Sequence, residues 1–304
     1  MLNDTDNEFL TRVGPGTPMG EYLRRFWMPF LLPEELPTPD CPPVRTTLLG
    51  EKLVAYKDTN GDIGLVDNYC PHRRASLFFG RNEECGLRCV YHGWKFDKDG
   101  NCVDMPSEPA ESNFKDKVKI RAYPAREWGG LIWAYMGPSE YIPELPNIDW
   151  ATLPDSHRVI SKRIQESNWV QSVEGGIDSS HISFLHSGVT PYMRDNPDKA
   201  SNPNLSTQDT SPKFTVDETD VGLLIGARRE VENDQSYVRI TQMLLPFYTM
   251  IPGAVEPGKQ IGGHAWVPID DYNCWNFTIS WNPYRPFTYD EIKTHWSGYG
   301  LHAL

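Results

Sequence analysis

Two pairs of cysteine and histidine constrain this 304-residue chain more than any other feature of its sequence. Cys70 and His72 flank a single proline, and after sixteen further residues Cys89 and His92 flank Val90 and Tyr91. Two thiolates and two imidazoles also suit a tetrahedral zinc ion. The commonest zinc pattern, however, groups cysteine with cysteine and histidine with histidine. Here each loop supplies one residue of each kind.

Mixed pairs of this kind favour a Rieske [2Fe-2S] cluster, in which two thiolates hold one iron and two imidazoles hold the other. Each loop then gives one ligand to each iron. Pro71 stiffens the first loop, while Gly93 and Trp94 close the second with a small residue and an aromatic cover. The pattern predicts an electron-transfer site held by Cys70, His72, Cys89 and His92.

A second candidate ligand set follows about ninety residues later, at Asp178, His181 and His186. Asp178 and His181 are three residues apart and would share one face of a helix. His186 would then point about 140° away from His181 on an ideal helix. The two imidazoles therefore bind one Fe(II) ion only if the helix is distorted or ends before His186, and the paired glycines 175–176 weaken it there. Two imidazoles and one carboxylate on one face of the ion leave positions for oxygen and substrate.

Three segments, residues 7–37, 70–109 and 168–186, carry a resemblance to a known family. They resemble the oxygenase (alpha) component of the Rieske non-heme iron aromatic-ring-hydroxylating oxygenases, and more narrowly its phthalate dioxygenase-like group. One departure is Arg74, where the family often has glycine, and we interpret it as a change at the loop surface with little consequence.

The resemblance implies an α+β fold with an N-terminal all-β Rieske domain. The C-terminal catalytic domain would be a curved antiparallel sheet around the helix that bears the iron ligands. We expect an N-terminal helical segment at 1–37, the Rieske domain at 38–145 and the catalytic domain at 146–304. Pro138, Pro143 and Pro146 mark the linker between the last two.

The family also implies the chemistry. The chain would hydroxylate an aromatic compound, most simply an aromatic acid, by cis-dihydroxylation, monohydroxylation or oxidative dealkylation. Dioxygen would react at a mononuclear Fe(II), and a partner reductase of the flavin and iron-sulfur type would deliver electrons from NADH or NADPH. The alternative is a Rieske electron carrier or an inactive relative, and His181 and His186 argue against a pure carrier because a carrier needs no second metal site.

By the same resemblance, Asp178 is a bridge rather than the third iron ligand. Its carboxylate would accept hydrogen bonds from His181 and from the cluster ligand His92 of a neighbouring subunit. Electrons would then cross between subunits of a homo-oligomer, a trimer or a hexamer built as a stack of trimers. A carboxylate in such a position orients a ligating imidazole and raises its basicity. The plain alternative for Asp178 is an acid on a helix surface.

The third iron ligand in the family is a carboxylate on a C-terminal helix that the sequence up to Leu304 does not contain in recognisable form. We therefore expect that this chain lacks the family's C-terminal segment. Four acids are candidates for a substitute, although each is better explained as a solvated acid. They are Asp270, Asp271, Asp290 and Glu291.

The net charge of -12 disfavours nucleic acid and anionic membranes as partners. The first residues lack the pattern of a signal peptide, and no apolar run approaches a membrane span, so we expect a soluble cytoplasmic protein. Four cysteines outside the ligand pairs have no framework spacing and are expected to be free thiols, with a Cys85–Cys102 disulfide as the alternative. The remaining two are Cys41 and Cys274.

Local patterns predict a short helix at 21–26, a hairpin turn at 59–62, and strands near 131–135 and 158–165. Further strands are expected near 222–225, 237–245, 260–268 and 275–281. Residues 194–212 are polar and without periodic apolar positions, which suits a lid over the pocket or a surface loop.

The strand near 237–245 has two faces that decide the role of Arg239. Its alternation places Val238, Ile240 and Gln242 on one face, opposite Arg239 and Thr241. If the Arg239 face meets the ligand-bearing helix, the guanidinium enters an apolar cavity and requires an anionic partner such as a substrate carboxylate. A salt bridge at the sheet surface is the alternative.

Overall fold

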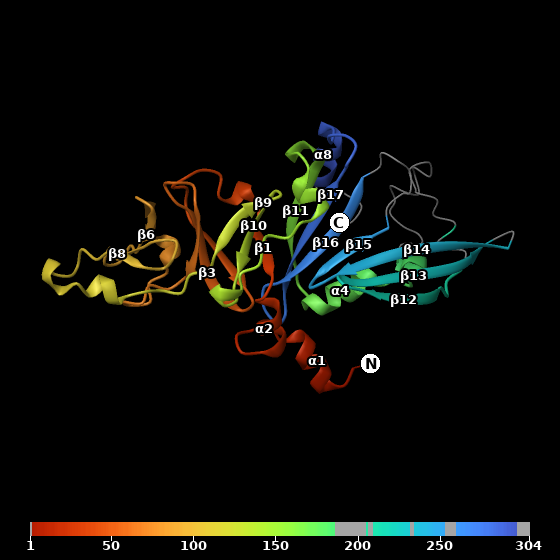
Figure 1. The fold of residues 1–304 in the computed structure, drawn as a ribbon, viewed down its shortest axis with the longest axis horizontal. Coiled ribbons are helices and arrows are strands. Elements are labelled where there is room, and N and C mark those ends of the chain that lie inside the picture. The colour runs from red at the N-terminus through yellow and green to blue at the C-terminus, as the bar shows by residue number, and fades with distance from the viewer. Residues whose placement is uncertain (1, 186–204, 206–208, 232–233, 253–259, 297–304) are drawn as a thin grey trace. The chain divides into compact units, whose positions relative to one another are not determined.

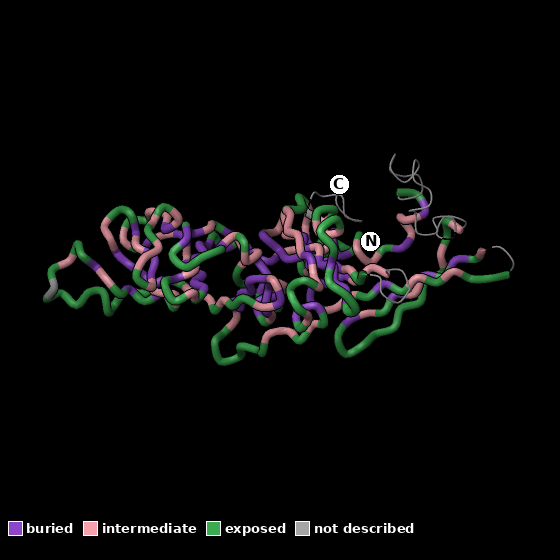
Figure 2. Tube along the Cα trace, turned by 90° about the horizontal axis from the view of Figure 1, so that it is seen from above, coloured by how far each residue is buried: buried purple, intermediate pink, exposed green. Residues whose placement is uncertain are grey.

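The computed structural model describes residues 2–185, 205, 209–231, 234–252 and 260–296. Contacts within the chain divide it into two compact units. The first contains Met1–Asp155, Lys162–Asn168 and Val267–Trp275, and the second contains Ser156–Ser161, Trp169–Trp266 and Asn276–Leu304. Buried residues, purple in Figure 2, line the interior of each unit.

The chain begins with two helices and a strand. α1 (Asp4–Thr11) is capped by the Asn3 side chain, and α2 (Pro18–Leu23) is capped by Thr17. α2 begins three residues before the expected position because Thr17 is a good N-cap and proline suits the first helical position. β1 (Trp27–Leu31) follows and pairs with β10 (Leu131–Tyr135), which also pairs with β9 (Ala125–Trp128). The expected helical segment therefore ends in a buried strand.

Two more antiparallel sheets complete the β part of the first unit (Figure 1). One is made of β2 (Val44–Leu48), β3 (Glu51–Lys57) and β4 (Ile63–Asp67), and the turn between β3 and β4 lies where the hairpin was predicted. The other has the strand order β5-β6-β7-β8. Its strands are β5 (Arg81–Glu83), β6 (Gly86–Arg88), β7 (Lys95–Phe96) and β8 (Cys102–Asp104).

Polar contacts hold the two later segments of the first unit, Lys162–Asn168 and Val267–Trp275, against its N-terminal part. Lys162 donates to both Glu35 carboxylate oxygens at 3.0 Å, and its ammonium lies 4.2 Å from the centre of the Trp275 ring. Asn168 donates to the carbonyls of Thr11 and Asp271 at 3.0 and 2.8 Å. These bonds tie residues that precede α4 to the N-terminal segment.

The second unit is built on a seven-stranded antiparallel sheet with the order β11-β17-β16-β15-β14-β13-β12. In the described residues that follow β11, the chain forms α4 (Trp169–Ile177) and α5 (Ile182–Leu185). The strands are β11 (Arg158–Gln165), β12 (Lys213–Thr219), β13 (Gly222–Val231), β14 (Gln235–Leu244), β15 (Tyr248–Ile251), β16 (Ile261–Pro268) and β17 (Cys274–Trp281). The predicted strands are all present, and the α+β fold class is confirmed.

The remaining elements are short. α3 (Asp149–Thr152) follows the proline-rich stretch, and α8 (Tyr289–Trp296) follows β17. Among the described residues, six 3-10 turns connect larger elements: η1 (Pro33–Glu35), η2 (Leu77–Phe79), η3 (Ala110–Ser112), η4 (Phe114–Lys117), η5 (Ser139–Tyr141) and η6 (Asp155–His157). Among the described residues, no helix has the length and apolar character needed to span a membrane.

α4 covers one face of the large sheet, where it packs against β15 and β14 (Figure 1). Gly176 permits this approach, because a Cβ at that position would lie 2.7 Å from the Thr249 hydroxyl oxygen. On β14, Thr241 is buried while Val238 and Ile240 are 53% and 52% exposed. The face of β14 that carries Thr241 and Arg239 is therefore the covered one.

Candidate functional site

The first ligand loop is a tight turn between β4 and η2. The Cys70 N–H donates to the Ala75 carbonyl, and the Arg74 N–H donates to the Cys70 carbonyl, both at 2.9 Å. Arg74 has a φ of 59°, a left-handed conformation that glycine adopts at no steric cost. The Arg74 guanidinium lies 4.7 Å from the centre of the Tyr69 ring. The departure from glycine thus carries a conformational cost that this stacking contact offsets.

The second ligand loop connects β6 to β7. The Cys89 N–H donates to the Trp94 carbonyl at 2.8 Å, and the Gly93 N–H donates to the Cys89 carbonyl at 3.1 Å. Gly93 has a φ of 78°, and a Cβ there would lie 2.7 Å from Cγ of Pro106. Glycine at this position therefore satisfies both the turn and the close packing.

The two loops bring all four predicted cluster residues together in the first unit. Cys70 and Cys89 are both buried in its hydrophobic core, and their thiols are hydrogen-bonded to each other. The His72 and His92 rings lie 4.4 Å apart, centre to centre. Cysteine thus meets cysteine and histidine meets histidine, as a cluster with two inequivalent irons requires.

The electrostatics of the thiol pair favour metal binding. The hydrogen bond from the Cys70 thiol lowers the pKa of Cys89 to about 6, although burial opposes this. Backbone N–H groups of Tyr91 and His92 also donate to the Cys89 sulfur and lower its pKa further. Conversely, donating to Cys89 raises the pKa of Cys70, and burial raises it further. Thiolate is the form that ligates iron, and backbone donors to sulfur are among the features that tune such clusters.

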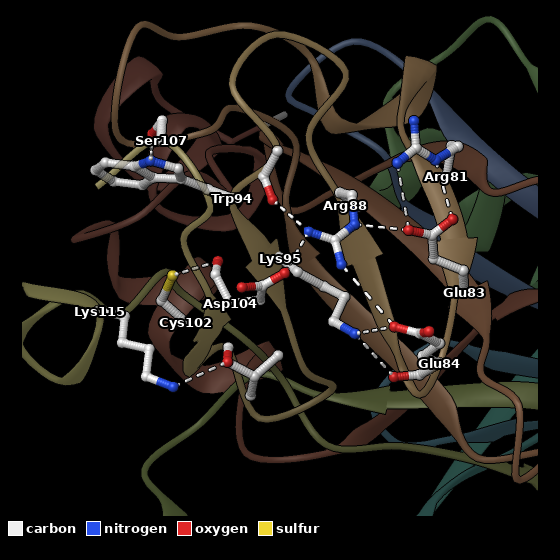
Figure 3. Close-up of polar contacts among 12 residues, drawn as sticks. Arg81, Glu83, Glu84, Arg88, Trp94, Lys95, Cys102, Asp104, Ser107 and Lys115 are labelled. Carbon is white, nitrogen blue, oxygen red and sulfur yellow. Dashed lines mark hydrogen bonds and ion pairs between the residues drawn. The ribbon is translucent and has the colours of Figure 1, made fainter. Parts of the chain in front are cut away.

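His72 supplies a direct test of whether these residues fit a metal. Its Nδ1 is buried and has no hydrogen-bond partner among the described residues. A buried ring nitrogen without a partner is costly unless another group, such as a metal ion, occupies that position. The Trp94 ring stacks on His72 at 4.6 Å with 7° between the planes, and the indole N–H donates to the Ser107 hydroxyl at 3.0 Å (Figure 3 shows this hydrogen bond).

A Rieske cluster needs two pairs of side chains and no group of three, because each iron takes two protein ligands. In the part of the chain that the structure describes, no three His, Cys, Asp or Glu side chains gather as a single-ion site.

All six cysteines have free thiols, so the alternative of a Cys85–Cys102 disulfide is wrong. The Cys102 thiol instead donates to the Asp104 carbonyl at 3.4 Å.

The second ligand set lies on a turn, which corrects the expectation that Asp178 and His181 share a helix face. α4 ends at Ile177, and α5 begins at Ile182. The Asp178 carboxylate accepts the backbone N–H groups of Ser180 at 2.7 Å and His181 at 3.2 Å. An aspartate that satisfies the following backbone N–H groups competes with helix continuation. α4 therefore ends before His186. This is one of the two conditions under which His181 and His186 were expected to bind one Fe(II) ion.

The Asp178 carboxylate also contacts the His181 ring, with Oδ2 lying 3.1 Å from Nδ1. Burial raises the pKa of Asp178, but the hydrogen bonds from Ser180 and His181 outweigh it and leave the pKa below its ordinary value. The carboxylate is therefore ionised at neutral pH and holds the imidazole in a fixed orientation.

Arg229 is a residue of this site that sequence patterns missed. It is fully buried on β13, and its guanidinium donates to both the carbonyl and the hydroxyl of Ser179 and to the Asp209 carbonyl. Burial, and then the positive charge of Arg239, lower the pKa of Arg229. Ser179 follows Asp178 directly, so Arg229 anchors the turn that carries the second ligand set.

Arg239 lies on the covered face of β14. This is the orientation in which its guanidinium was expected to need an anionic partner, and not the alternative of a salt bridge at the sheet surface. Its Nε is buried and has no hydrogen-bond partner among the described residues. Arg229 and Arg239 share this face of the sheet, because Ala227 pairs with Arg239 and Arg229 pairs with Tyr237. Two guanidinium groups therefore lie near each other beside the Asp178 turn, and the carboxylates of Asp209 and Asp178 offset only part of the charge effect on Arg229, whose pKa stays below its ordinary value.

The four candidate acids near the C-terminus have local roles. Asp270 accepts the backbone N–H groups of Tyr272 and Asn273 at 2.8 Å, and Asp271 pairs with Arg12 at 3.0 Å. Glu291 caps α8 and pairs with Arg285 at 2.7 Å. Asp290 lies in the first turn of α8, where an acid favours the helix dipole. These contacts fit the structural explanation of each acid.

His186 and most of the predicted lid at 194–212 lie outside the described residues.

Comparison with known proteins assigns the two parts of the chain. Residues 26–124 match the Rieske [2Fe-2S] domain, and residues 134–296 match the family described as LigXa C-terminal domain like. This chain belongs to the Rieske oxygenases, as an alpha component. The match favours a Rieske cluster over zinc as the cofactor of residues 26–124, and the assignment of Cys70, His72, Cys89 and His92 as its ligands stays a prediction. The predicted domain boundaries stay a prediction.

Two curated relatives illustrate the similarity of this Rieske oxygenase chain. The 3-chlorobenzoate-3,4-dioxygenase oxygenase subunit of Comamonas testosteroni is 44% identical over 91% of this chain and 63% of its own length. The phthalate 4,5-dioxygenase oxygenase subunit of Pseudomonas putida is 44% identical over 93% of this chain and 65% of its own length. The chain thus spans a little under two thirds of either relative.

A solved structure supports the fold. Dicamba monooxygenase bound to 3,6-dichlorosalicylic acid has a TM-score of 0.68 and 20% identity, over 90% of this chain and 82% of that one. At this identity the likeness concerns the fold alone.

Proposed function

We propose that this chain is the oxygenase component of a Rieske system that hydroxylates an aromatic acid. The system would use dioxygen and electrons from an NAD(P)H-dependent reductase. The observation that carries the proposal is the Asp178–His181 contact on the turn after α4, in a chain that also has a Rieske domain. An electron carrier needs no such second site. A cytoplasmic location agrees with a reductase that draws on NAD(P)H.

The proposed cluster ligands are Cys70 and Cys89 on one iron and His72 and His92 on the other. The partnerless Nδ1 of His72 and the hydrogen-bonded thiol pair support this division. When bound, the cluster supplies electrons one at a time. The chain itself excludes water from both thiols and presents backbone N–H groups to the sulfurs, which stabilises the thiolate form.

The proposed ligands of the mononuclear Fe(II) are His181 and His186, an arrangement that leaves positions for dioxygen and substrate. Asp178 orients the His181 ring through the 3.1 Å contact. We further propose that Asp178 accepts a hydrogen bond from the cluster ligand His92 of a neighbouring subunit, so that the active form is a trimer or a hexamer. The proposed reaction is cis-dihydroxylation, monohydroxylation or oxidative dealkylation.

Arg239 supports an aromatic acid as the substrate. A guanidinium whose Nε is buried without a partner is stabilised by a carboxylate, which accepts its N–H groups in a bidentate fork. The neighbouring charge of Arg229 adds to the attraction for an anion. The substrate carboxylate would bind Arg239 and hold the ring beside the iron on the α4 side of the sheet.

Metal content and oxygen uptake test the proposed function together. We expect about three irons per chain, because a Rieske cluster holds two and a mononuclear site holds one. With a suitable reductase, an aromatic carboxylic acid should stimulate oxygen uptake, and its uncharged amide should not. Two irons per chain with no substrate-dependent uptake would instead identify an electron carrier.

Asp178→Asn tests the proposed bridge. The variant should retain the cluster and most of the iron, because the amide keeps the size of the side chain. Electron transfer from the reduced cluster to the iron should slow by a large factor, as single-turnover kinetics would measure. Kinetics equal to the wild type would refute the bridge.

Arg239→Met tests the carboxylate site. Loss of a charged hydrogen bond costs about 1.5–3 kcal/mol, so KM for the acid should rise roughly 10-fold to 100-fold. Arg228→Met is the matched control, because Arg228 lies on the opposite face of β13 and its side chain pairs with Glu230 in solvent. An equal change of KM in both variants would contradict the assignment.

A further inference from the structure

Arg88 occupies a special position in the Rieske domain. It is the last residue of β6, directly before Cys89, and it pairs with Lys95 of β7 across the second ligand loop. Its side chain is only 11% exposed although it carries a permanent charge. A buried charge requires partners that repay its lost hydration, and those partners show what the residue does.

The Arg88 guanidinium joins three segments around the ligand loop (Figure 3). Its Nη1 donates to the Gly93 carbonyl at 2.8 Å and to the Asp104 carboxylate at 2.6 Å, and its Nε donates to Glu83 at 2.6 Å. Gly93 directly follows the proposed ligand His92. The guanidinium thus holds the loop at both ends, through the chain at Cys89 and through the carbonyl after His92.

The geometry requires arginine. A guanidinium presents five N–H donors in a planar fork, whereas a lysine ammonium is a single point charge on a flexible stem. A lysine at position 88 would keep the charge near the carboxylates without bonding Glu83, Asp104 and Gly93 together. Lys95 does not replace these bonds, because its ammonium pairs with the Glu84 carboxylate at 3.0 Å, a group that the Arg88 guanidinium also approaches, at 3.9 Å.

The charge of Arg88 also affects the cluster. Its positive charge balances the carboxylates of Glu83 and Asp104, which would otherwise lie beside the ligand loop with less compensation. Reduction adds one negative charge to a cluster, and net charge and hydrogen bonding near a cluster set its potential. Arg88 therefore favours the reduced state.

We propose that Arg88 is a positioning residue of the Rieske centre, which fixes the second ligand loop through the Gly93 carbonyl and raises the reduction potential of the cluster. This inference rests on the proposed function only in that Cys89 and His92 are taken as cluster ligands. Arg88 acts through the loop and through its charge.

Redox titration of the purified protein, followed by visible and EPR spectra, tests the inference. Arg88→Met should shift the equilibrium between oxidised and reduced cluster toward the oxidised form by about tenfold, a fall of ~59 mV for one electron. Its EPR g-values should also shift, because the loop loses an anchor. Arg88→Lys should restore most of the potential and leave the g-values altered.

Arg81→Met is the matched control. Arg81 also bonds Glu83, at 2.9 Å, but its side chain is 66% exposed and makes no hydrogen bond or ion pair with the ligand loop among the described residues (Figure 3). The control should leave potential and g-values unchanged. Asp104→Asn, which keeps Arg88 and removes one negative charge, should raise the potential, and adding it to Arg88→Met should recover part of the loss.

An unchanged potential in a cluster-containing Arg88→Met protein would overturn the inference. If Arg88→Met fails to assemble a cluster, Arg88→Lys decides: altered g-values with most of the potential retained support the role of Arg88, and g-values equal to those of the wild type overturn it. Failure of the proposed ligand assignment looks different, because Cys89→Ser and His92→Cys would then leave the Rieske spectrum of the protein unchanged, and failure of the oxygenase function would appear as two irons per chain without substrate-dependent oxygen uptake.

Discussion

Replacing Gly176 by alanine tests how closely α4 must approach the sheet that carries Arg229 and Arg239. A Cβ at position 176 would lie 2.7 Å from Oγ1, 3.0 Å from Cγ2 and 3.1 Å from Cβ of Thr249. A separation of 2.7 Å is too short for unbonded heavy atoms of this kind, so α4 or β15 must shift. Overpacking of this size costs typically about 1–3 kcal/mol.

The neighbouring Gly175 provides a matched control, because a Cβ there would meet nothing within 4 Å. Both alanines gain helix propensity, about 0.5–1 kcal/mol per residue. Gly175→Ala should therefore stabilise the protein slightly, whereas Gly176→Ala should fall below it by about 1–3 kcal/mol. Urea unfolding measures this difference, and it corresponds to a midpoint shift of roughly 1 M.

The shift should also reach the Asp178 turn, which begins directly after α4. We expect Gly176→Ala to lose iron to a chelator faster than Gly175→Ala does. A Thr249→Ala background removes the contacts with Oγ1 and Cγ2 and leaves only the 3.1 Å approach to Cβ, so the stability of Gly176→Ala should there move most of the way toward that of Gly175→Ala, as a double-mutant cycle would measure. If the two alanine variants have the same stability in the wild-type background, the close approach of α4 and β15 does not constrain the site.

The features that could be predicted from the sequence are those that depend on residues close together in the chain. The alternation of β14 and the run at Arg158–Gln165 identify strands because side chains alternate between faces every second residue. The mixed Cys-His pairs identify a cluster because each loop must hold one ligand for each iron. Such patterns do not depend on what lies far away in sequence.

The missed features depend on distant partners. β1 was expected within a helical segment, and its identity as a strand follows from pairing with β10. Helix spacing placed Asp178 and His181 on one face, but the carboxylate of Asp178 instead bonds to backbone N–H groups of its own turn. Arg229 reaches this turn from a strand fifty residues away, and no local pattern near Ser179 could have indicated it.

Two further predictions concern the first unit. Glu51→Gln should lower the free energy of unfolding by about 3 kcal/mol, because it removes the buried carboxylate 2.6 Å from the Arg24 guanidinium and leaves only the exposed Glu21, 3.7 Å away. Burial raises the pKa of Glu51, but Arg121, Tyr123 and Arg24 lower it more, so this stabilisation is present above the unfolded-state pKa and is lost as pH falls through the lower folded-state value. Unfolding in urea should therefore show a smaller difference between variant and wild type at about pH 3 than at about pH 7, and an equal difference would contradict the reasoning. Gly93→Ala should reduce the amount of cluster per chain, measured by visible absorbance. Its left-handed φ of 78° costs about 1–2 kcal/mol for alanine, and the added Cβ would also lie 2.7 Å from Pro106. Gly61→Ala has the same left-handed strain, with a φ of 88°, but its Cβ would meet nothing within 4 Å, so it should keep the cluster. Adding Pro106→Ala to Gly93→Ala removes the close contact and keeps the backbone strain, so it should restore part of the absorbance, and a double variant with no more cluster than Gly93→Ala would show that packing against Pro106 does not hold the ligand loop.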